Sequence, residues 1–363
     1  MADNKDKKVL NVPHLRFPVF SGEWEKYTIG DLCEEFKSGK NIKAESIQEE
    51  GVYPVFGGNG LRGYTDRYNH DGDYVLIGRQ GALCGNVRFV TGKTYITEHA
   101  IAAKATNDNY TRYLEYLFVR LNLGQFSDQS AQPGLAVNKL LKIETYVPSK
   151  AEQLKIAFLL RLLDERIATQ NKIIEDLKKL KSAIAETVFN NMQGHLTSLS
   201  AICNIVKGKQ VNGEELSEKG KYYVMNGGIT PSGYYDQCNT PANTISVSEG
   251  GNSCGYVQYN KSSFWSGGHC YTLQDITSGV DTQYLFHYLK RYESNIMNLR
   301  IGTGLPNIQK KDLENFRIAL PPSNVQKEIS TCLTAIEDKI MVEVKWLDST
   351  QKEKLYLLRQ MFI

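Results

Sequence analysis

The sequence has no long hydrophobic run, no cysteine pairing pattern and no large surplus of either charge. No uninterrupted apolar run reaches the roughly 18 residues of a membrane helix, and the polar start of the chain lacks the apolar core of a signal peptide. The 7 cysteines include no C-x-x-C pair and no Cys/His ligand spacing, which favours free thiols over disulfides or a zinc site. We therefore expect a soluble, cytoplasmic protein with no membrane partner.

Basic and acidic residues are almost balanced, at 43 and 40. No segment is a basic arm. If the protein binds nucleic acid, folding must gather the positive groups onto one face.

The motifs of common catalytic sites are also missing. Residues 92–94 read Gly-Lys-Thr, like the end of a phosphate-binding P-loop, but the first glycine of that motif would fall at Val87. There is no G-x-S-x-G, no H-E-x-x-H and no catalytic turn of an adenine methyltransferase. His99 and His269 each lack a second ligand nearby, which favours a structural role over a metal site. The sequence predicts a chain without catalytic, cofactor-binding or metal-binding residues.

What the sequence does contain is a repeat. Its 363 residues are enough for two domains, and sliding the sequence by 170 residues aligns "DYVLIGRQGALCGNV" with "NTISVSEGGNSCGYV". The offset grows slowly and reaches 173 residues where Gln153 matches Gln326. Small loop insertions in a duplicated unit produce such drift, so we interpret the chain as a tandem duplication.

Each repeated unit has a globular part and a long helical part. The globular parts, about residues 24–147 and 197–321, are rich in glycine, tyrosine and short strand-like runs. Short helices are expected at "YLEYLFVRLN" and "YLFHYLKRYE". Ser149 with Glu152, and Ser323 with Gln326, have the spacing of a capping box, which predicts the start of a long helix at each place.

Apolar residues in both long helices recur with a period of 3.5 residues, as in a coiled coil. In the first helix they are Leu160, Leu163, Ile167, Ile174, Leu177, Ile184 and Val188, and in the second Leu333, Ile336, Ile340, Leu347, Leu357 and Met361.

Two packing arrangements explain this stripe: the helices pack on each other along their length, or each packs on its own globular part. A helix of about 40 residues is roughly 60 Å long, more than a small domain covers, so we favour helix pairing.

Helix pairing predicts an α+β fold in which two α/β domains are separated by two long antiparallel coiled-coil helices, related by a pseudo-twofold axis. The predicted boundaries are 1–149 for the first head, 150–192 for the first helix, 193–322 for the second head and 323–363 for the second helix. Gln170 and Glu343 are equivalent in the repeat and lie near the helix midpoints. We expect them to face each other and fix the register of the spacer.

Polar residues beside the loop glycines are able to read base edges or contact DNA. In the first copy they are Arg62, Tyr64, Arg79, Gln80, Asn86 and Arg88. In the second copy they are Asn226, Tyr234, Tyr235, Glu249, Asn252, Ser253, Gln258 and Lys261. The glycines match between the copies whereas the polar residues differ, which suggests that two different short sequences are read. The alternative is that these are ordinary solvated loop residues.

Several local motifs carry a family resemblance. They are "W-x-x-Y-T-I-G-D-L" at 24–32, "Y-P-V-F-G-G-N-G" at 53–60, "G-T-G-L-P-N-I" at 302–308, "P-S-K-A-E-Q-L-K-I" at 148–156, "L-D-E-R-I" at 163–167 and "I-E-D-K-I" at 336–340. With them the whole chain resembles the specificity subunit of a type I restriction–modification system. The resemblance identifies the two heads as target-recognition domains and the helices as their spacer.

The resemblance implies a non-catalytic DNA-recognition subunit. Each head would read half of an interrupted sequence in double-stranded DNA, and the helices would set the gap. Two methyltransferase subunits, which bind S-adenosylmethionine, would flip and methylate an adenine in each half-site. Two restriction/translocase subunits, dependent on ATP and Mg²⁺, would cut unmethylated DNA. The chain itself would hold no cofactor.

Two other interpretations are a fused methyltransferase–endonuclease, which would need the missing motifs, and a repeat interaction scaffold with no nucleic acid partner.

Overall fold

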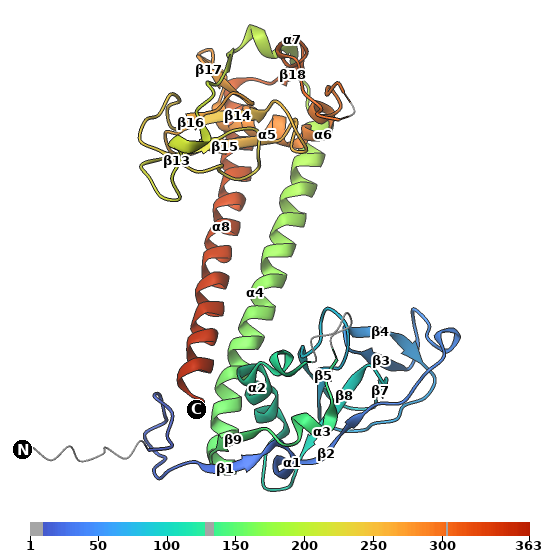
Figure 1. The fold of residues 1–363 in the computed structure, drawn as a ribbon. Helices are drawn as coiled ribbons and strands as arrows, with labels where there is room; N and C mark the ends of the chain where they lie inside the picture. The colour runs from blue at the N-terminus through green and yellow to red at the C-terminus, as the bar shows by residue number, and fades with distance from the viewer. Residues whose placement is uncertain (1–9, 128–133, 303) are drawn as a thin grey trace, which may run out of the picture. The chain divides into compact units, whose positions relative to one another are not determined.

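A computed structural model describes residues 10–127, 134–302 and 304–363. Residues 1–9 of the polar N-terminal stretch and Thr303 of the 302–308 motif lie outside this range. The chain divides into two compact units, Met1–Gln170 with Trp346–Ile363, and Asn171–Lys345 (Figure 1). The cut between the units passes through the long helices, so each unit contains one head and parts of both helices.

Both units contain the same set of strands. In the first unit these are β1 (Glu25–Thr28), β2 (Cys33–Ser38), β3 (Tyr53–Gly57), β4 (Gly60–Thr65), β5 (Tyr74–Gly78), β6 (Val87–Val90), β7 (Tyr95–Ile96), β8 (Ala100–Ala105) and β9 (Glu144–Val147). In the second unit they are β10 (His195–Ser198), β11 (Asn204–Lys207), β12 (Tyr222–Met225), β13 (Tyr234–Tyr235), β14 (Thr244–Ser248), β15 (Val257–Asn260), β16 (Trp265–Ser266), β17 (Cys270–Gln274) and β18 (Arg317–Leu320).

The sheets repeat strand for strand. The first unit pairs β1 with β9 and has sheets of order β2-β8-β5-β6 and β4-β3-β7. The second unit pairs β10 with β18 and has the orders β11-β17-β14-β15 and β13-β12-β16. Even the parallel pairing is repeated, because Val55 is in register with Tyr95 in the first unit and Val224 with Trp265 in the second. The predicted duplication and the predicted fold class are therefore confirmed.

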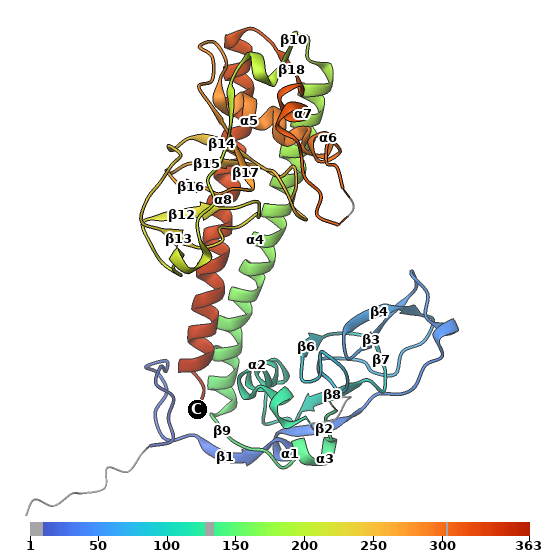
Figure 2. The same ribbon diagram turned by 45° about the horizontal axis from the view of Figure 1, so that its top comes forward.

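The helices fall into short ones within the heads and two long ones. The short ones are α1 (Ile29–Leu32), α2 (Thr111–Leu121), α3 (Val137–Leu140), α5 (Thr282–Arg291), α6 (Glu293–Met297) and α7 (Lys310–Glu314). The long ones are α4 (Lys150–Asn191) and α8 (Ser323–Gln360). Helix α2 packs on β5, β6 and β8, and its repeat counterpart α5 packs on β15 (Figure 2).

The long helices share the hydrophobic core of each head. In the first unit, Leu160 of α4 and Leu358 of α8 belong to one core, and Phe362 stacks on Tyr113 of α2 at 5.3 Å. Each unit therefore joins the start of one long helix to the end of the other, which requires the helices to run antiparallel. Stripe residues such as Leu160 and Met361 pack in the core of the head, and the ion pair between Lys354 and Asp164 joins the two helices there.

The second unit repeats this arrangement with the helices exchanged. Phe189 near the end of α4 meets Tyr284 of α5 edge to face at 5.9 Å, and Leu333 near the start of α8 is in the same core. Gln170 and Glu343 are both buried residues of the long helices. They belong to different units, so their pairing stays a prediction.

The two predicted capping boxes are wrong. Glu152 points its carboxylate at Arg16, whose Nη2 and Nε lie 2.7 and 2.8 Å from it. Ser323 is already the first residue of α8, and its hydroxyl donates to the carbonyl of Gly279. Gln326 likewise bonds to the head instead of its own helix end. The spacing located both helix starts, at Lys150 and Ser323, but these polar side chains anchor each start to adjacent segments instead of capping it.

Candidate nucleic-acid interface

Three segments of the first head converge around Gly58, in the turn between β3 and β4. A Cβ atom at Gly58 would lie 2.7 Å from the carbonyl oxygen of His99, so a larger residue would push the two segments apart. The backbone N–H of Arg79, at the start of the β5–β6 loop, donates to the same carbonyl at 2.9 Å. The turn, the loop and His99 are therefore held together by backbone contacts.

Arginines border this turn. A Cβ atom at Gly57 would lie 2.8 Å from Cδ of Arg62, and one at Gly60 would lie 3.1 Å from Nη2 of Arg88. Arg62 and Arg88 are exposed and Arg79 is half-buried. None of the three forms an ion pair with a residue that the structure describes. Their guanidinium groups are thus available for phosphates or guanine edges.

Gln80 and His99 add hydrogen-bonding groups to the arginine cluster. Oε1 of Gln80 lies 3.3 Å from Nδ1 of His99, and Nε2 of His99 lies 3.2 Å from Glu98. The amide nitrogen of the exposed Gln80 remains a donor, and Asn86 is exposed at the other end of the loop. Tyr64 lies elsewhere, on β4, where it is half-buried and pairs through its backbone with Gln48.

In the second head, Glu249 lies inside the structure. Its side chain is buried, with Oε1 2.5 Å from Nζ of Lys207 and 3.2 Å from the hydroxyl of Tyr271. Burial, together with this carboxylate, raises the pKa of Tyr271 well above its ordinary value. Oε2 of Glu249 lies 3.6 Å from Nδ1 of His269. We therefore interpret Glu249 as the residue that positions Lys207 and His269 and not as a direct reader of cytosine.

Asn226 has a similar positioning role. Its Oδ1 accepts a hydrogen bond from the backbone N–H of His269 at 3.1 Å. Asn252 and Ser253 stand at the tip of the β14–β15 loop, and Asn252 is exposed there. This loop is the repeat counterpart of the one that carries Arg79 and Gln80.

The other predicted residues of the second head lie apart from this loop. The hydroxyl of Tyr235 donates to Glu215 at 3.0 Å, and Tyr234 pairs through its backbone with Ser217. Lys261 forms an ion pair with Asp338 of α8 at 2.7 Å. Gln258 lines a cavity of about 460 Å³ beside the same helix.

Sequence reasoning missed the exposed basic groups next to Glu249. Side-chain exposure is 52% for Lys207 and 64% for His269. The matches of Lys37 with Lys207 and of His99 with His269 in the repeat were the available signal. The positions of Lys207 and His269 depend on Glu249, which is far from Lys207 in sequence.

The structure also bears on metal and membrane sites. Among residues 10–127, 134–302 and 304–363, no group of three or more His, Cys, Asp or Glu side chains is arranged to hold a metal ion. None of the described helices combines the length and hydrophobicity needed to cross a membrane.

The chain matches known proteins over most of its length. The family model described as type I restriction modification DNA specificity domain matches twice, at residues 21–179 and 196–346. Over 361 residues the chain is 24% identical to a putative type I specificity subunit of Mycoplasma genitalium, covering 93% of this chain and 94% of that one.

A second relative matches over a shorter region. Over 180 residues the chain is 38% identical to the specificity subunit of the type I restriction enzyme EcoprrI of Escherichia coli, and the match spans 48% of this chain and 44% of that relative.

A solved structure confirms the fold. The crystal structure of a type I restriction–modification S subunit from M. genitalium superposes with a TM-score of 0.82 at 22% identity, covering 97% of this chain and 99% of that one. The chain therefore belongs to the family of type I restriction modification DNA specificity proteins and contains two such domains.

Proposed function

We propose that this protein is the DNA-recognition subunit of a type I restriction–modification complex and that its heads read two different half-sites. One observation carries the proposal: equivalent loops on a duplicated scaffold carry different side chains. The exposed Gln80 of the first head stands where the second has Gly250, and the exposed Asn252 of the second stands where the first has Ala82. Identical heads would read identical half-sites, whereas these loops offer different donors and acceptors to base edges.

The first head is suited to guanine and phosphate. Arginine donates two parallel hydrogen bonds to guanine O6 and N7, or to a phosphate. Arg62, Arg79 and Arg88 surround one glycine turn and form no ion pairs within the described residues. The second head offers Lys207, His269 and Asn252 instead, and its lysine is paired with Glu249.

The chain acts through partners and is not itself catalytic in this proposal. Two methyltransferase subunits carrying S-adenosylmethionine methylate one adenine in each half-site, and two restriction/translocase subunits cleave unmodified DNA with ATP and Mg²⁺. The long helices set the number of base pairs between half-sites. The complex works in the cytoplasm, where it meets the host chromosome.

Methylation mapping of a host that expresses the complete system tests this function. We expect methyladenine at an interrupted target with two unlike half-sites. The isolated chain, incubated with tritiated S-adenosylmethionine and DNA, should transfer no label, and adding the methyltransferase subunit should restore transfer. A continuous target, or transfer by the chain alone, would contradict the proposal.

A further inference from the structure

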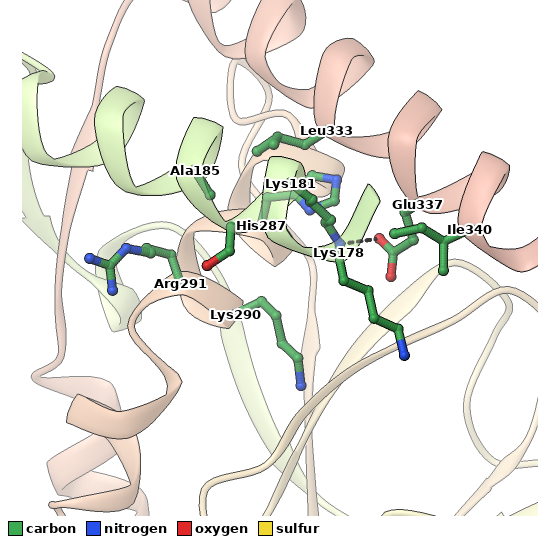
Figure 3. Close-up of a pocket in the computed structure, with 10 residues that line it drawn as sticks. Lys178, Lys181, Ala185, His287, Lys290, Arg291, Leu333, Glu337 and Ile340 are labelled. Atoms are coloured by element: carbon green, nitrogen blue, oxygen red, sulfur yellow. Dashed lines mark ion pairs between the residues drawn. The ribbon is translucent and has the colours of Figure 1, made fainter. Parts of the chain in front are cut away.

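The second unit contains a basic cavity that the recognition loops do not use. It has a volume of about 390 Å³ and lies between the end of α4, helix α5 and the start of α8 (Figure 3). Lys178 and Lys181 of α4 and Lys290 and Arg291 of α5 line it, together with apolar Leu333 and Ala185. This volume falls in the range of small-ligand sites, about 300–1,000 Å³.

The basic groups are only partly neutralised. Lys181 is 3.1 Å from Glu337, the carboxylate that lines the cavity, and Lys290 is held by Glu293 at 2.5 Å. Arg291 reaches Glu186 only at 3.6 Å. Nε of Arg291 is shielded from solvent and has no hydrogen-bond partner among the described residues.

Lys178 is the free cation of the cavity. It forms no ion pair within the part of the chain that the structure describes, and it is exposed. Figure 3 shows its side chain extending toward the same side as Lys290.

His287 lies in the cavity wall and is uncharged. It is buried, and its Nε2 lies 2.9 Å from the hydroxyl of Thr334. Burial first, and then the charge of Lys181, lowers the pKa of His287 to about 3. The imidazole is therefore neutral at pH 7 and offers no competing charge.

The equivalent place in the first unit carries larger side chains. The counterparts of Ser182 and Ala185 are Leu355 and Leu358, and Leu358 is buried. The counterpart of His287 is Tyr116, whose hydroxyl donates to Asp164 at 2.8 Å. Small residues thus line the cavity where the first unit has Leu358 in its hydrophobic core and Leu355 exposed beside it.

Two further differences add charge. Lys178 and Lys290 occupy positions that are Gln351 and Val119 in the first unit. The scaffold does not require these lysines, so the second copy has both a hollow and two extra cations at one place.

We propose that this cavity binds a phosphate group attached to an apolar or aromatic body, as in a nucleoside triphosphate or a strand of DNA. The base or sugar would lie on Leu333 and Ala185, and the phosphate would contact Lys178 and Lys181. This site is separate from the reading of bases and does not depend on it.

Binding of a fluorescent adenosine triphosphate to the full chain tests the proposal. The double variant Ser182→Leu, Ala185→Leu introduces the leucines that stand at these positions in the first unit. It fills the cavity and leaves its charges in place. Lys178→Gln removes the free cation. Each change should weaken binding by about tenfold or more, the effect of losing one charged hydrogen bond or the space for the ligand. Lys172→Gln, an exposed lysine of α4 outside the cavity, is the matched control and should bind like the parent.

Competition distinguishes the two phosphate sources. If unlabelled random-sequence duplex displaces the nucleotide at equal phosphate concentration, the site takes DNA backbone; if only inorganic triphosphate does so, it takes a free nucleotide. If the double variant unfolds at a lower temperature than the parent, the single variant Ser182→Leu, at an exposed position, is used in its place. Absence of binding by the parent, or equal binding by the parent, Lys178→Gln and the filled variant, would overturn the proposal.

Discussion

Gln326 at the start of α8 makes the same contacts as Gln153 at the start of α4. Oε1 of Gln153 accepts from the backbone N–H of Tyr110 at 3.0 Å, and its Nε2 donates to the carbonyl of Pro148 at 3.0 Å. Oε1 of Gln326 accepts from Asp281 N–H at 2.9 Å, and its Nε2 donates to the carbonyl of Pro321 at 2.8 Å. Both side chains are buried. One glutamine in each copy thus fastens a long helix to its head.

Replacing this glutamine should weaken the attachment. Gln326→Ala leaves the N–H of the half-buried Asp281 and the carbonyl of the buried Pro321 without this partner, and an unsatisfied buried group costs about 1–3 kcal/mol. We expect the free energy of unfolding of the second unit to fall by about 2–4 kcal/mol, measured by urea denaturation. Lys327→Ala at the next, exposed position is the control. Equal stability of the two variants would show that the glutamine does not anchor the helix.

His287 should make stability depend on pH. Its pKa of about 3 in the folded protein lies below the usual 6.5, so between these values the unfolded chain binds the extra proton. The stabilisation is complete above pH 6.5 and is lost as pH falls toward 3. From pH 7 to pH 5 the parent should lose about 2 kcal/mol more than His287→Gln, at about 1.4 kcal/mol per pKa unit. Parallel pH profiles of parent and variant in chemical denaturation would contradict this assignment.

Arg88 should contribute to reading the first half-site. Arg88→Ala in the assembled methyltransferase should weaken binding to the mapped target by about 1–3 kcal/mol, the range for one bidentate contact. It should also reduce discrimination at one position of one half-site. Arg120→Ala, at the exposed end of α2, serves as the control. Fluorescence anisotropy with single-base variants of the target would detect both effects. An unchanged specificity profile would show that Arg88 contacts the DNA phosphates or does not contact the DNA.

The helices should act as the ruler between half-sites. Inserting one turn into α4 beside Gln170 and one into α8 beside Glu343 lengthens each helix by about 5.4 Å. The methylated target should then gain one or two base pairs in its gap, at about 3.4 Å per base pair. Methylation at the original spacing only would show that the helices do not set the gap.

The sequence predicted the features that depend on local pattern. The duplication was visible because glycines, cysteines and the glutamine pair 153 and 326 recur at nearly constant offset, and both long helices begin where proline ends each head. The structure places them at Lys150–Asn191 and Ser323–Gln360, close to the predicted 150–192 and 323–363.

What depends on distant partners could not be predicted. Glu249 looked like a base reader because it stands in a loop, but Lys207 and Tyr271 come from other strands and draw its carboxylate inward. The capping boxes failed for the same reason, since Arg16 and Gly279 are distant in sequence from the helix starts. The basic cavity became visible only once α4, α5 and α8 were seen side by side.

Exchange of the first head tests the central claim, that the heads are independent readers of different half-sites. Residues 1–149 would be replaced by those of a relative with another specificity, keeping Tyr113 and Tyr116, whose partners are Phe362, just beyond the end of α8, and Asp164 of α4. Methylation mapping of a host with the exchanged subunit and its partners should show one half-site changed, with the other half-site and the gap preserved. Alteration of both half-sites, or of neither, would contradict the account.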